Sequence, residues 1–139
     1  RPSDIVTWPL ICYEAIFPYE VKVSNKDVDV IINVTNDTWY GNSSGAYQHF
    51  EISRMRAIEN GLPMLRVANN GISAFIDPVG RILEKTELNE VTILDNLIPE
   101  KLPHETLFSR YPLWIVLLEV YFVLILQLFG KFCICIRPK

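Results

Sequence analysis

The chain has 139 residues, a formal net charge of −3 and a hydrophobic content of 50%. This length is enough for one domain, and the charge gives no reason to expect nucleic acid as a partner. The hydrophobic residues are unevenly spread, because residues 1–110 resemble a globular protein whereas residues 111–139 are almost continuously apolar. The chain begins at Arg1 without a methionine, close to an expected strand and without a visible signal peptide, so we expect a fragment whose upstream part is missing.

A cysteine stands at the end of the first apolar run, in the tetrapeptide Ile11-Cys12-Tyr13-Glu14. This places a thiol beside a carboxylate where a strand should stop. Because a cysteine attacks only as its thiolate, a strand end next to a polar group is a suitable place for a nucleophile. The alternative is a buried structural cysteine, since free cysteine is among the most buried residue types. The position of Cys12 leaves both interpretations open.

The middle of the chain alternates between strand and helix patterns. Residues 28–34 form a short β-branched run, which is typical of a central strand buried on both faces. Residues 35–45 form a polar loop that carries Trp39 and Tyr40, and such aromatics cover either their own domain's core or the wall of a pocket.

A helix and a small meander are expected next. Residues 46–60 have helical periodicity, and Gly61 and Pro63 supply the stop. Further strands are expected over 64–68, 72–76, 81–83 and 91–94. The first two form a hairpin about a turn at 69–71, in which Gly71 is expected to adopt a positive φ. This order favours a mixed α/β sheet with helices on its faces over an all-β sandwich.

Several motifs together resemble the nitrilase (carbon-nitrogen hydrolase) superfamily. They are Ile11-Cys12-Tyr13-Glu14-Ala15-Ile16-Phe17-Pro18, Asn36-Asp37-Thr38-Trp39-Tyr40-Gly41, Gln48-His49, Arg54-Met55-Arg56-Ala57 and Asn69-Asn70-Gly71. The resemblance covers residues 4–94 and is closest to the membrane-bound branch of lipoprotein N-acyltransferases, which carry a terminal hydrophobic helix that soluble nitrilases lack.

The resemblance implies a nitrilase-like αββα sandwich, of which this chain holds the C-terminal part, and a Glu, Lys and Cys triad. It implies that the cysteine takes a fatty acyl chain from a phospholipid as a thioester. The acyl chain then passes to the N-terminal amino group of the S-diacylglyceryl-cysteine of an apolipoprotein. By position, Cys12 matches the nucleophile, and Tyr13 and Glu14 match two further residues that the reaction needs. No nucleotide is required, because the product amide is more stable than the ester consumed, and no cofactor or metal is expected.

The base Glu and the Lys of the triad lie upstream of the cysteine in this superfamily, and none of the eleven residues before Cys12 fits either role. We therefore expect this chain to be inactive by itself. Glu14 is expected to position groups rather than to act as base, because side chains two apart on a strand stand roughly 6–7 Å from each other. Lys22 and Lys26 are interpreted as surface lysines, and His49 as a hydrogen-bonding residue rather than a base.

The acyl donor needs an apolar path to a polar reaction centre. On the resemblance, the substrate-binding residues are predicted to be Asn36, Thr38, Trp39 and Tyr40. The turn at 69–71 is expected to serve the backbone rather than a ligand.

The apolar tail predicts a membrane helix over residues 113–136, which are enough to span a bilayer core. Glu119 and Gln127 inside it are costly in hydrocarbon and indicate contact with other helices. Cys133 and Cys135 are interpreted as packing residues rather than metal ligands. Basic residues at the end place the C-terminus in the cytoplasm, so the catalytic part is expected on the periplasmic side of a bacterial inner membrane.

The expected organisation is thus a catalytic part over 1–97, a linker over 98–110 and a transmembrane helix with a basic tail over 111–139. Two alternatives to the acyltransferase stay open. One is a membrane-tethered amidase acting on small amides. The other is an inactive truncated product, because a sandwich cut here exposes unpaired strand edges.

Overall fold

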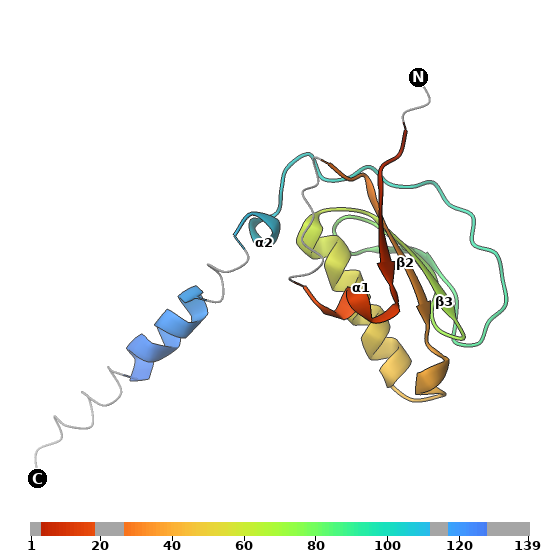
Figure 1. Cartoon of the computed structure of the whole chain (residues 1–139), viewed down its shortest axis with the longest axis horizontal. Helices are drawn as coiled ribbons and strands as arrows, with labels where there is room; N and C mark the ends of the chain where they lie inside the picture. The colour runs from red at the N-terminus through yellow and green to blue at the C-terminus, as the bar shows by residue number, and fades with distance from the viewer. Residues whose placement is uncertain (1–3, 19–26, 112–116, 128–139) are drawn as a thin grey trace, which may run out of the picture.

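The computed structural model describes residues 4–18, 27–111 and 117–127. These residues form five strands, two 3-10 helices, the α-helices α1 and α2, and a helical segment over 117–127. The elements before this segment are β1 Thr7–Ile11, η1 Cys12–Ile16, β2 Val30–Asn36, η2 Thr38–Tyr40, α1 Gly45–Asn60, β3 Met64–Asn69, β4 Ala74–Ile76, β5 Ile82–Lys85 and α2 Leu107–Arg110 (Figure 1). Lys22 and Lys26 lie outside the described residues.

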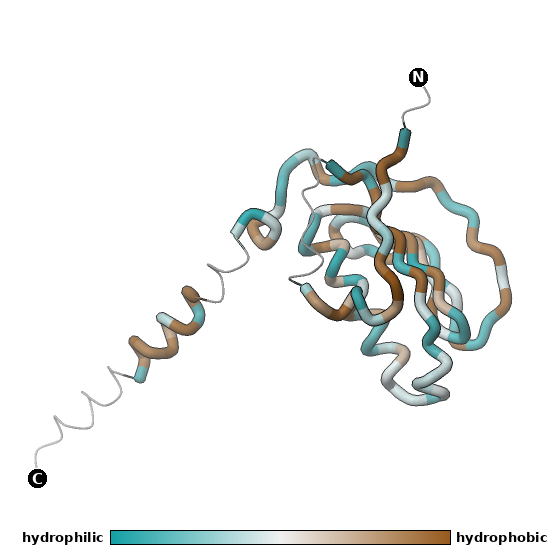
Figure 2. The backbone as a smooth tube through the Cα atoms, viewed as in Figure 1, coloured by the Kyte–Doolittle hydropathy of each residue, from teal (hydrophilic) through white to brown (hydrophobic). Residues whose placement is uncertain are grey.

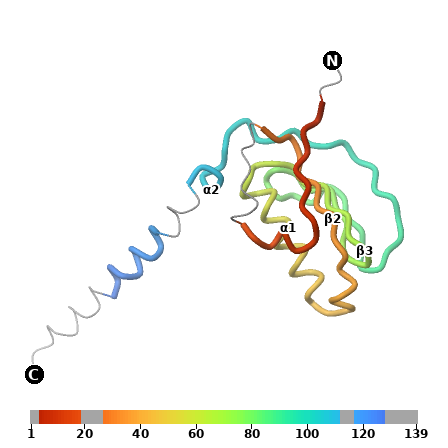
Figure 3. Tube along the Cα trace, in the orientation of Figure 1, coloured from red at the N-terminus to blue at the C-terminus, as the bar shows by residue number. Residues whose placement is uncertain are grey.

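The five strands form one mixed sheet in the order β1-β2-β3-β4-β5. β1, β2 and β3 are parallel, whereas β4 and β5 are antiparallel to their neighbours. The parallel β2 and β3 are joined through α1, which Figure 3 shows beside the strands. The predicted mixed sheet and the β3–β4 hairpin are confirmed, as are the helix over 46–60 and its stop, where Gly61 has a φ of 64°.

One face of the sheet is packed against α1. The strand residues on this face lie in two rows across the sheet, and the core combines them with apolar residues of α1. The first row is Trp8, Ile31, Met64 and Ile76, and the second is Leu10, Asn33, Arg66 and Ala74. The first row is apolar, while the second row brings an amide and a guanidinium into the buried layer. This polar row lies nearer the carboxyl ends of the parallel strands, where β1 meets η1.

The opposite face of the sheet carries an exposed apolar row. Ile11, Val34 and Val67 are side by side in register on β1, β2 and β3. Their exposed fractions are 57%, 47% and 58%. No helix or strand among the described residues covers this row, so the sheet has one packed face and one open face.

Asn70, and not Gly71, carries the left-handed backbone at the turn between β3 and β4. Asn70 has a φ of 59°, so the expectation of a positive φ at Gly71 is wrong. Asparagine tolerates this region because its short polar side chain bonds locally. Gly71 is required for another reason, since a Cβ there would stand 2.2 Å from Oδ2 of the buried Asp37.

The expected strand over 91–94 is absent. Val91 and Ile93 have exposed fractions of 100% and 90%, and these residues are not part of any strand. Alternating apolar residues predict a strand only where a neighbouring strand offers hydrogen bonds, and these residues have no such neighbour.

Residues 98–110, predicted as a linker, pack back on the domain. The Lys101 ammonium lies 2.8 Å from the Asp29 carboxylate, and the Leu102 amide donates to the Gly61 carbonyl at 2.9 Å. The Thr106 hydroxyl donates to the Glu59 carbonyl. This segment therefore ties the end of α1 to the start of β2.

The apolar tail is described over residues 117–127, which are helical and mostly hydrophobic (Figure 2). Within the described residues, no helix has both the length and the apolar character needed to cross a membrane. The rest of the expected membrane helix, with Cys133 and Cys135, lies outside the described residues, so a single span over 113–136 stays a prediction.

Gly71→Ala is expected to lower the free energy of unfolding by about 1–3 kcal/mol, because the added methyl would press on a buried carboxylate held in place by Arg66. Urea denaturation followed by circular dichroism measures this loss. Asn70→Gly is the matched control, since glycine suits the left-handed backbone, and its loss is expected to stay below about 1 kcal/mol. A larger loss for Asn70→Gly would contradict the steric explanation.

Candidate active site

Cys12 lies at the first residue after β1, where the chain turns into η1. Its φ is 50°, a left-handed value that is unfavourable for a residue other than glycine. Strained residues of this kind cluster at functional sites, where the surrounding structure holds them in place. Because η1 is a 3-10 helix, the expectation that Cys12 and Glu14 share an extended strand is wrong. The predicted strand end at Ile11 is confirmed.

The surroundings of Cys12 favour the thiolate. The hydroxyl of Thr35 makes the largest contribution in lowering the pKa of the Cys12 thiol below its ordinary value. Burial opposes this effect, while the backbone N–H groups of Asn36 and Tyr13 also lower the pKa, and the charge of Asp37 raises it. The thiol is partly exposed, so a reactant can reach it.

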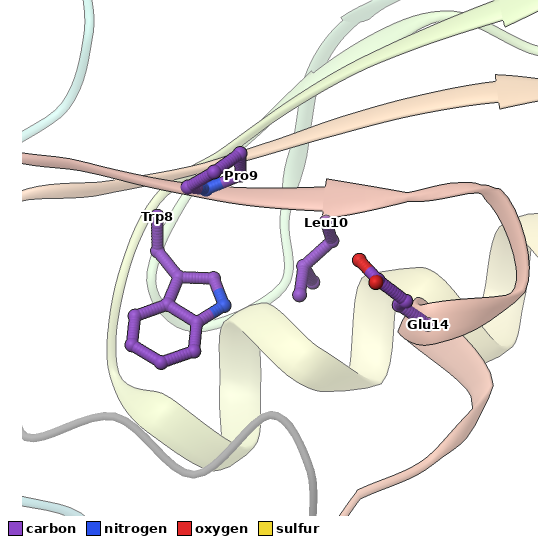
Figure 4. Close-up of a pocket in the computed structure, with 4 residues that line it drawn as sticks. All are labelled: Trp8, Pro9, Leu10 and Glu14. Carbon is purple, nitrogen blue, oxygen red and sulfur yellow. The ribbon is translucent and has the colours of Figure 1, made fainter.

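Glu14 is bound to the backbone of its own turn. Its carboxylate oxygen Oε2 accepts the Ile11 backbone N–H at 2.7 Å, which closes the turn around Cys12. Glu14 also lines a cavity of about 330 Å³ together with Trp8, Pro9 and Leu10 (Figure 4). In Figure 4 the side chains of Trp8, Leu10 and Glu14 lie on the same side of β1. Glu14 thus shapes both the turn and the wall of this cavity.

A buried ion pair lies behind the cysteine. Arg66 Nη2 donates to Asp37 Oδ2 at 2.7 Å, and both side chains are fully buried. The other carboxylate oxygen of Asp37 faces His49 Nδ1 at 2.8 Å and accepts the Thr35 hydroxyl at 3.1 Å. Burial alone would raise the pKa of Asp37, but the His49 hydrogen bond and the Arg66 charge outweigh it and hold that pKa below its ordinary value.

Arg66 is the centre of this network. Its Nη1 donates to Ser53 Oγ at 2.7 Å and also to Asn33 Oδ1, and its Nε donates to the Ile72 carbonyl at 3.3 Å. Sequence reasoning missed this role. The signal was present, because a charged residue at an inward position of a buried strand requires a buried partner.

His49 is buried and hydrogen bonded, as the sequence interpretation expected. Its ring stacks on Tyr13, with 5.5 Å between centroids, and the Tyr40 ring lies 5.7 Å away at an angle. The Tyr40 hydroxyl donates to the Tyr13 hydroxyl at 2.8 Å. Burial, followed by this hydrogen bond, raises the pKa of Tyr40 to about 12. The two tyrosines are therefore linked through their hydroxyls, and Tyr13 directly follows Cys12 on the turn.

The remaining predicted substrate-binding residues lie together. Asn36, Thr38 and Trp39 line one cavity of about 210 Å³. The side-chain oxygen Oδ1 of Asn36 accepts the Thr38 hydroxyl at 2.6 Å, and the Trp39 side chain is 81% exposed. No group of acidic, histidine and cysteine side chains suited to a metal ion occurs within the described part of the chain.

Comparisons with known proteins place these residues in a family context. The family model described as carbon-nitrogen hydrolase matches residues 7–101. The apolipoprotein N-acyltransferase of Rickettsia bellii (strain RML369-C) is 61% identical over 119 residues, which are 86% of this chain and 24% of that protein. The apolipoprotein N-acyltransferase of Brucella melitensis biotype 1 is 49% identical over 107 residues, 77% of this chain and 20% of that protein. The chain thus spans about a quarter or less of these relatives.

Solved structures support the same fold. A carbon-nitrogen hydrolase from Helicobacter pylori G27 matches with a TM-score of 0.55 at 18% identity, covering 64% of this chain and 39% of that chain. An amidase from Nesterenkonia sp. matches with a TM-score of 0.50 at 19% identity, covering 60% of this chain and 34% of that chain. At these identities the comparison shows the fold, a nitrilase-like α/β arrangement with a mixed sheet.

Arg66→Met is expected to cost roughly 3–5 kcal/mol of unfolding free energy, because it leaves the Asp37 carboxylate buried without its counter-ion. Urea denaturation at neutral pH measures the loss. Lys85→Met is the control, since both side chains of the Lys85–Glu87 pair are exposed, at 40% and 68%, and its removal should cost less than about 1 kcal/mol.

The pH dependence of the same variant supplies a second readout. In the parent chain the low pKa of Asp37 contributes stability above the ordinary carboxyl range, and this stability is lost as pH falls. Without the Arg66 charge, burial dominates and the pKa of Asp37 rises, so the loss should begin at a higher pH. Superimposable acid unfolding curves for Arg66→Met and the parent would contradict this assignment.

Proposed function

This chain belongs to the carbon-nitrogen hydrolase family, and from that premise we propose that it supplies the nucleophile of a lipoprotein N-acyltransferase. The observation that carries the proposal is Cys12 itself, a partly exposed thiol at a strained turn with a lowered pKa. The apolipoprotein N-acyltransferases of Rickettsia bellii and Brucella melitensis support this choice of reaction by their identity to the chain.

The proposed reaction has two steps. The Cys12 thiolate attacks the ester carbonyl of a phospholipid, a C–S bond forms, the C–O bond breaks, and the lysophospholipid oxygen leaves with a proton. The amino group of the S-diacylglyceryl-cysteine of an apolipoprotein then attacks the thioester, a C–N bond forms and the C–S bond breaks. A base removes the amine proton and the thiolate is restored.

Tyr13 and Glu14 act as helpers of the nucleophile in this proposal. Glu14 holds the turn through the Ile11 N–H, an arrangement that supports a positioning role rather than proton transfer. The Tyr13 hydroxyl, paired with Tyr40, is a neutral polar group on the reactant side of the site. The base Glu and the Lys that stabilises the oxyanion are proposed to come from polypeptide upstream of this chain in the complete enzyme.

The open face of the sheet supports the completed sandwich. An exposed row of Ile11, Val34 and Val67 is costly in water, since burying apolar surface contributes about 25 cal/mol per Å². We propose that a second sheet of an αββα sandwich covers this row. The apolar residues 117–127 are proposed to belong to a membrane helix, which keeps the site near its phospholipid at the periplasmic side of the inner membrane, with the C-terminus in the cytoplasm.

Cys12→Ala is expected to abolish formation of the acyl-enzyme and to lower acyl transfer by at least about 10³-fold. The experiment replaces the matching segment of the Rickettsia bellii relative with all 139 residues of this chain and supplies phospholipid with a labelled acyl chain. Mass spectrometry of the peptide containing Cys12 detects a hydroxylamine-sensitive acyl group. A Cys133→Ser/Cys135→Ser double variant, changed outside the described residues, should retain the acyl group.

Two results of this experiment would oppose the proposal. An acyl group that persists in Cys12→Ala and disappears in the double variant would assign the nucleophile to the tail. Hydrolysis of soluble amides without phospholipid, combined with no acyl transfer, would favour the tethered amidase.

Trp39→Ala is expected to raise the KM for phospholipid vesicles by about fivefold to tenfold with little change in stability, because an 81% exposed indole contributes to lipid contact but not to the core. The same hybrid enzyme is used, with vesicle concentration varied. Tyr47→Ala is the matched control, since Tyr47 is an exposed aromatic on α1. Equal KM values for both variants would remove Trp39 from the lipid path.

A further inference from the structure

Thr35 lies beside the cysteine because of the strand register. Ile11 on β1 pairs with Val34 on the parallel β2. Cys12 follows Ile11 as the first residue of η1, and Thr35 follows Val34 on β2, so the two residues are neighbours at the carboxyl ends of these strands. Thr35 is buried, with 6% exposure, and its hydroxyl is turned toward the polar network behind the site.

The Thr35 hydroxyl has one proton, which can be donated either to the Asp37 carboxylate or to the Cys12 sulfur. It donates to Asp37 Oδ1 at 3.1 Å, and its oxygen can at the same time accept a thiol proton. Asp37 does not depend on this hydrogen bond, because Arg66 Nη2 holds its Oδ2 at 2.7 Å and His49 Nδ1 lies 2.8 Å from its Oδ1. The Thr35 proton is therefore free to turn away without leaving the buried carboxylate unpaired.

We propose that the Thr35 hydroxyl is the donor that stabilises the Cys12 thiolate, turning its proton from Asp37 to the sulfur when the thiol ionises. The thiol proton leaves to a base, and one hydroxyl rotation accompanies it. In this proposal Thr35 is a catalytic residue, since its hydroxyl would donate to the reacting sulfur, and Asp37 is a positioning residue. The inference rests on the proposed role of Cys12 as nucleophile.

The charges around the sulfur are consistent with this role. The pKa of Cys12 is lowered with the Thr35 hydroxyl as the leading cause, whereas the Asp37 charge opposes it. Arg66 opposes that charge through its direct ion pair with Asp37. The titratable and charged groups near the site come from η1, η2, the end of β2, α1 and β3; they are Tyr13, Glu14, Tyr40, Asp37, His49 and Arg66. Beside these groups, the uncharged Thr35 hydroxyl can rotate and donate to the sulfur when the sulfur becomes negatively charged.

The test measures the ionisation of Cys12 directly, without any lipid. The full chain is alkylated with iodoacetamide across a pH series, and the modified peptide containing Cys12 is quantified by mass spectrometry. Because only the thiolate reacts, the pH midpoint reports the thiol pKa. For the parent chain, the midpoint in the folded state should lie below the midpoint of the same chain in concentrated urea.

Thr35→Val is expected to move the folded midpoint up toward the urea value and to slow alkylation at neutral pH by about tenfold, since it removes a hydrogen bond to a charged group. Thr35→Ser keeps a hydroxyl and should keep the low midpoint. Thr86→Val is the control, because Thr86 is a buried threonine whose hydroxyl accepts the Ser73 N–H, and its midpoint should equal that of the parent.

Two outcomes would overturn the inference. One is a Thr35→Val chain that is folded by circular dichroism and keeps the parent midpoint, which would leave Thr35 serving Asp37 alone. The other is a parent chain with the same midpoint in the folded state and in urea, a comparison that needs no variant to fold. Neither depends on acyl transfer, so a failure of the proposed reaction remains distinguishable from a failure of this inference.

Discussion

The buried pair of Asp37 and Arg66 is the interaction on which the rest of the domain depends. A guanidinium and a carboxylate without water around them are tolerated only when each has partners for its remaining hydrogen-bonding groups. Here the Arg66 guanidinium also donates to Asn33, Ser53 and the Ile72 carbonyl. The Asp37 carboxylate is also hydrogen bonded to His49 and Thr35. These partners come from β2, α1 and the turn after β3, so satisfying one charge pair fixes how the layers meet.

This network also determines the chemistry available to Cys12. The charge of Asp37 raises the pKa of the Cys12 thiol, and without a counter-ion this carboxylate would raise it further. Arg66 reduces this effect by pairing with the carboxylate, and Gly71 leaves room for the Asp37 side chain because a Cβ at residue 71 would meet it. The stability of the sheet and the reactivity of the thiol therefore have a common physical origin. A substitution far from the sulfur, such as one at β3, can alter both.

The sequence was informative wherever a pattern is local. The β-branched run of residues 28–34, the strand pattern of 64–68, the helical period of 46–60 and the stop at Gly61 predict the observed sheet and helix, and the strand ends next to Cys12, as expected. Partners that are distant in sequence were not predictable, because Arg66 and Asp37 are 29 positions apart and only the parallel pairing of β2 and β3 brings them together. Residues 91–94 show the converse, since a strand pattern without a neighbouring edge remains unpaired.

The distribution of groups along the chain follows from the same reasoning. The proposed nucleophile, its proposed hydroxyl donor and the buried charge pair all come from residues 12–66 and assemble through β1, β2, β3 and α1. The base and the oxyanion partner of the proposed mechanism are not among them. An activated thiol needs only local hydrogen bonds and a parallel strand end, whereas proton transfer across a reacting carbonyl needs a group on its far side. The open apolar face of the sheet is a surface on which further structure can pack, and through which such groups can be held in position opposite Cys12.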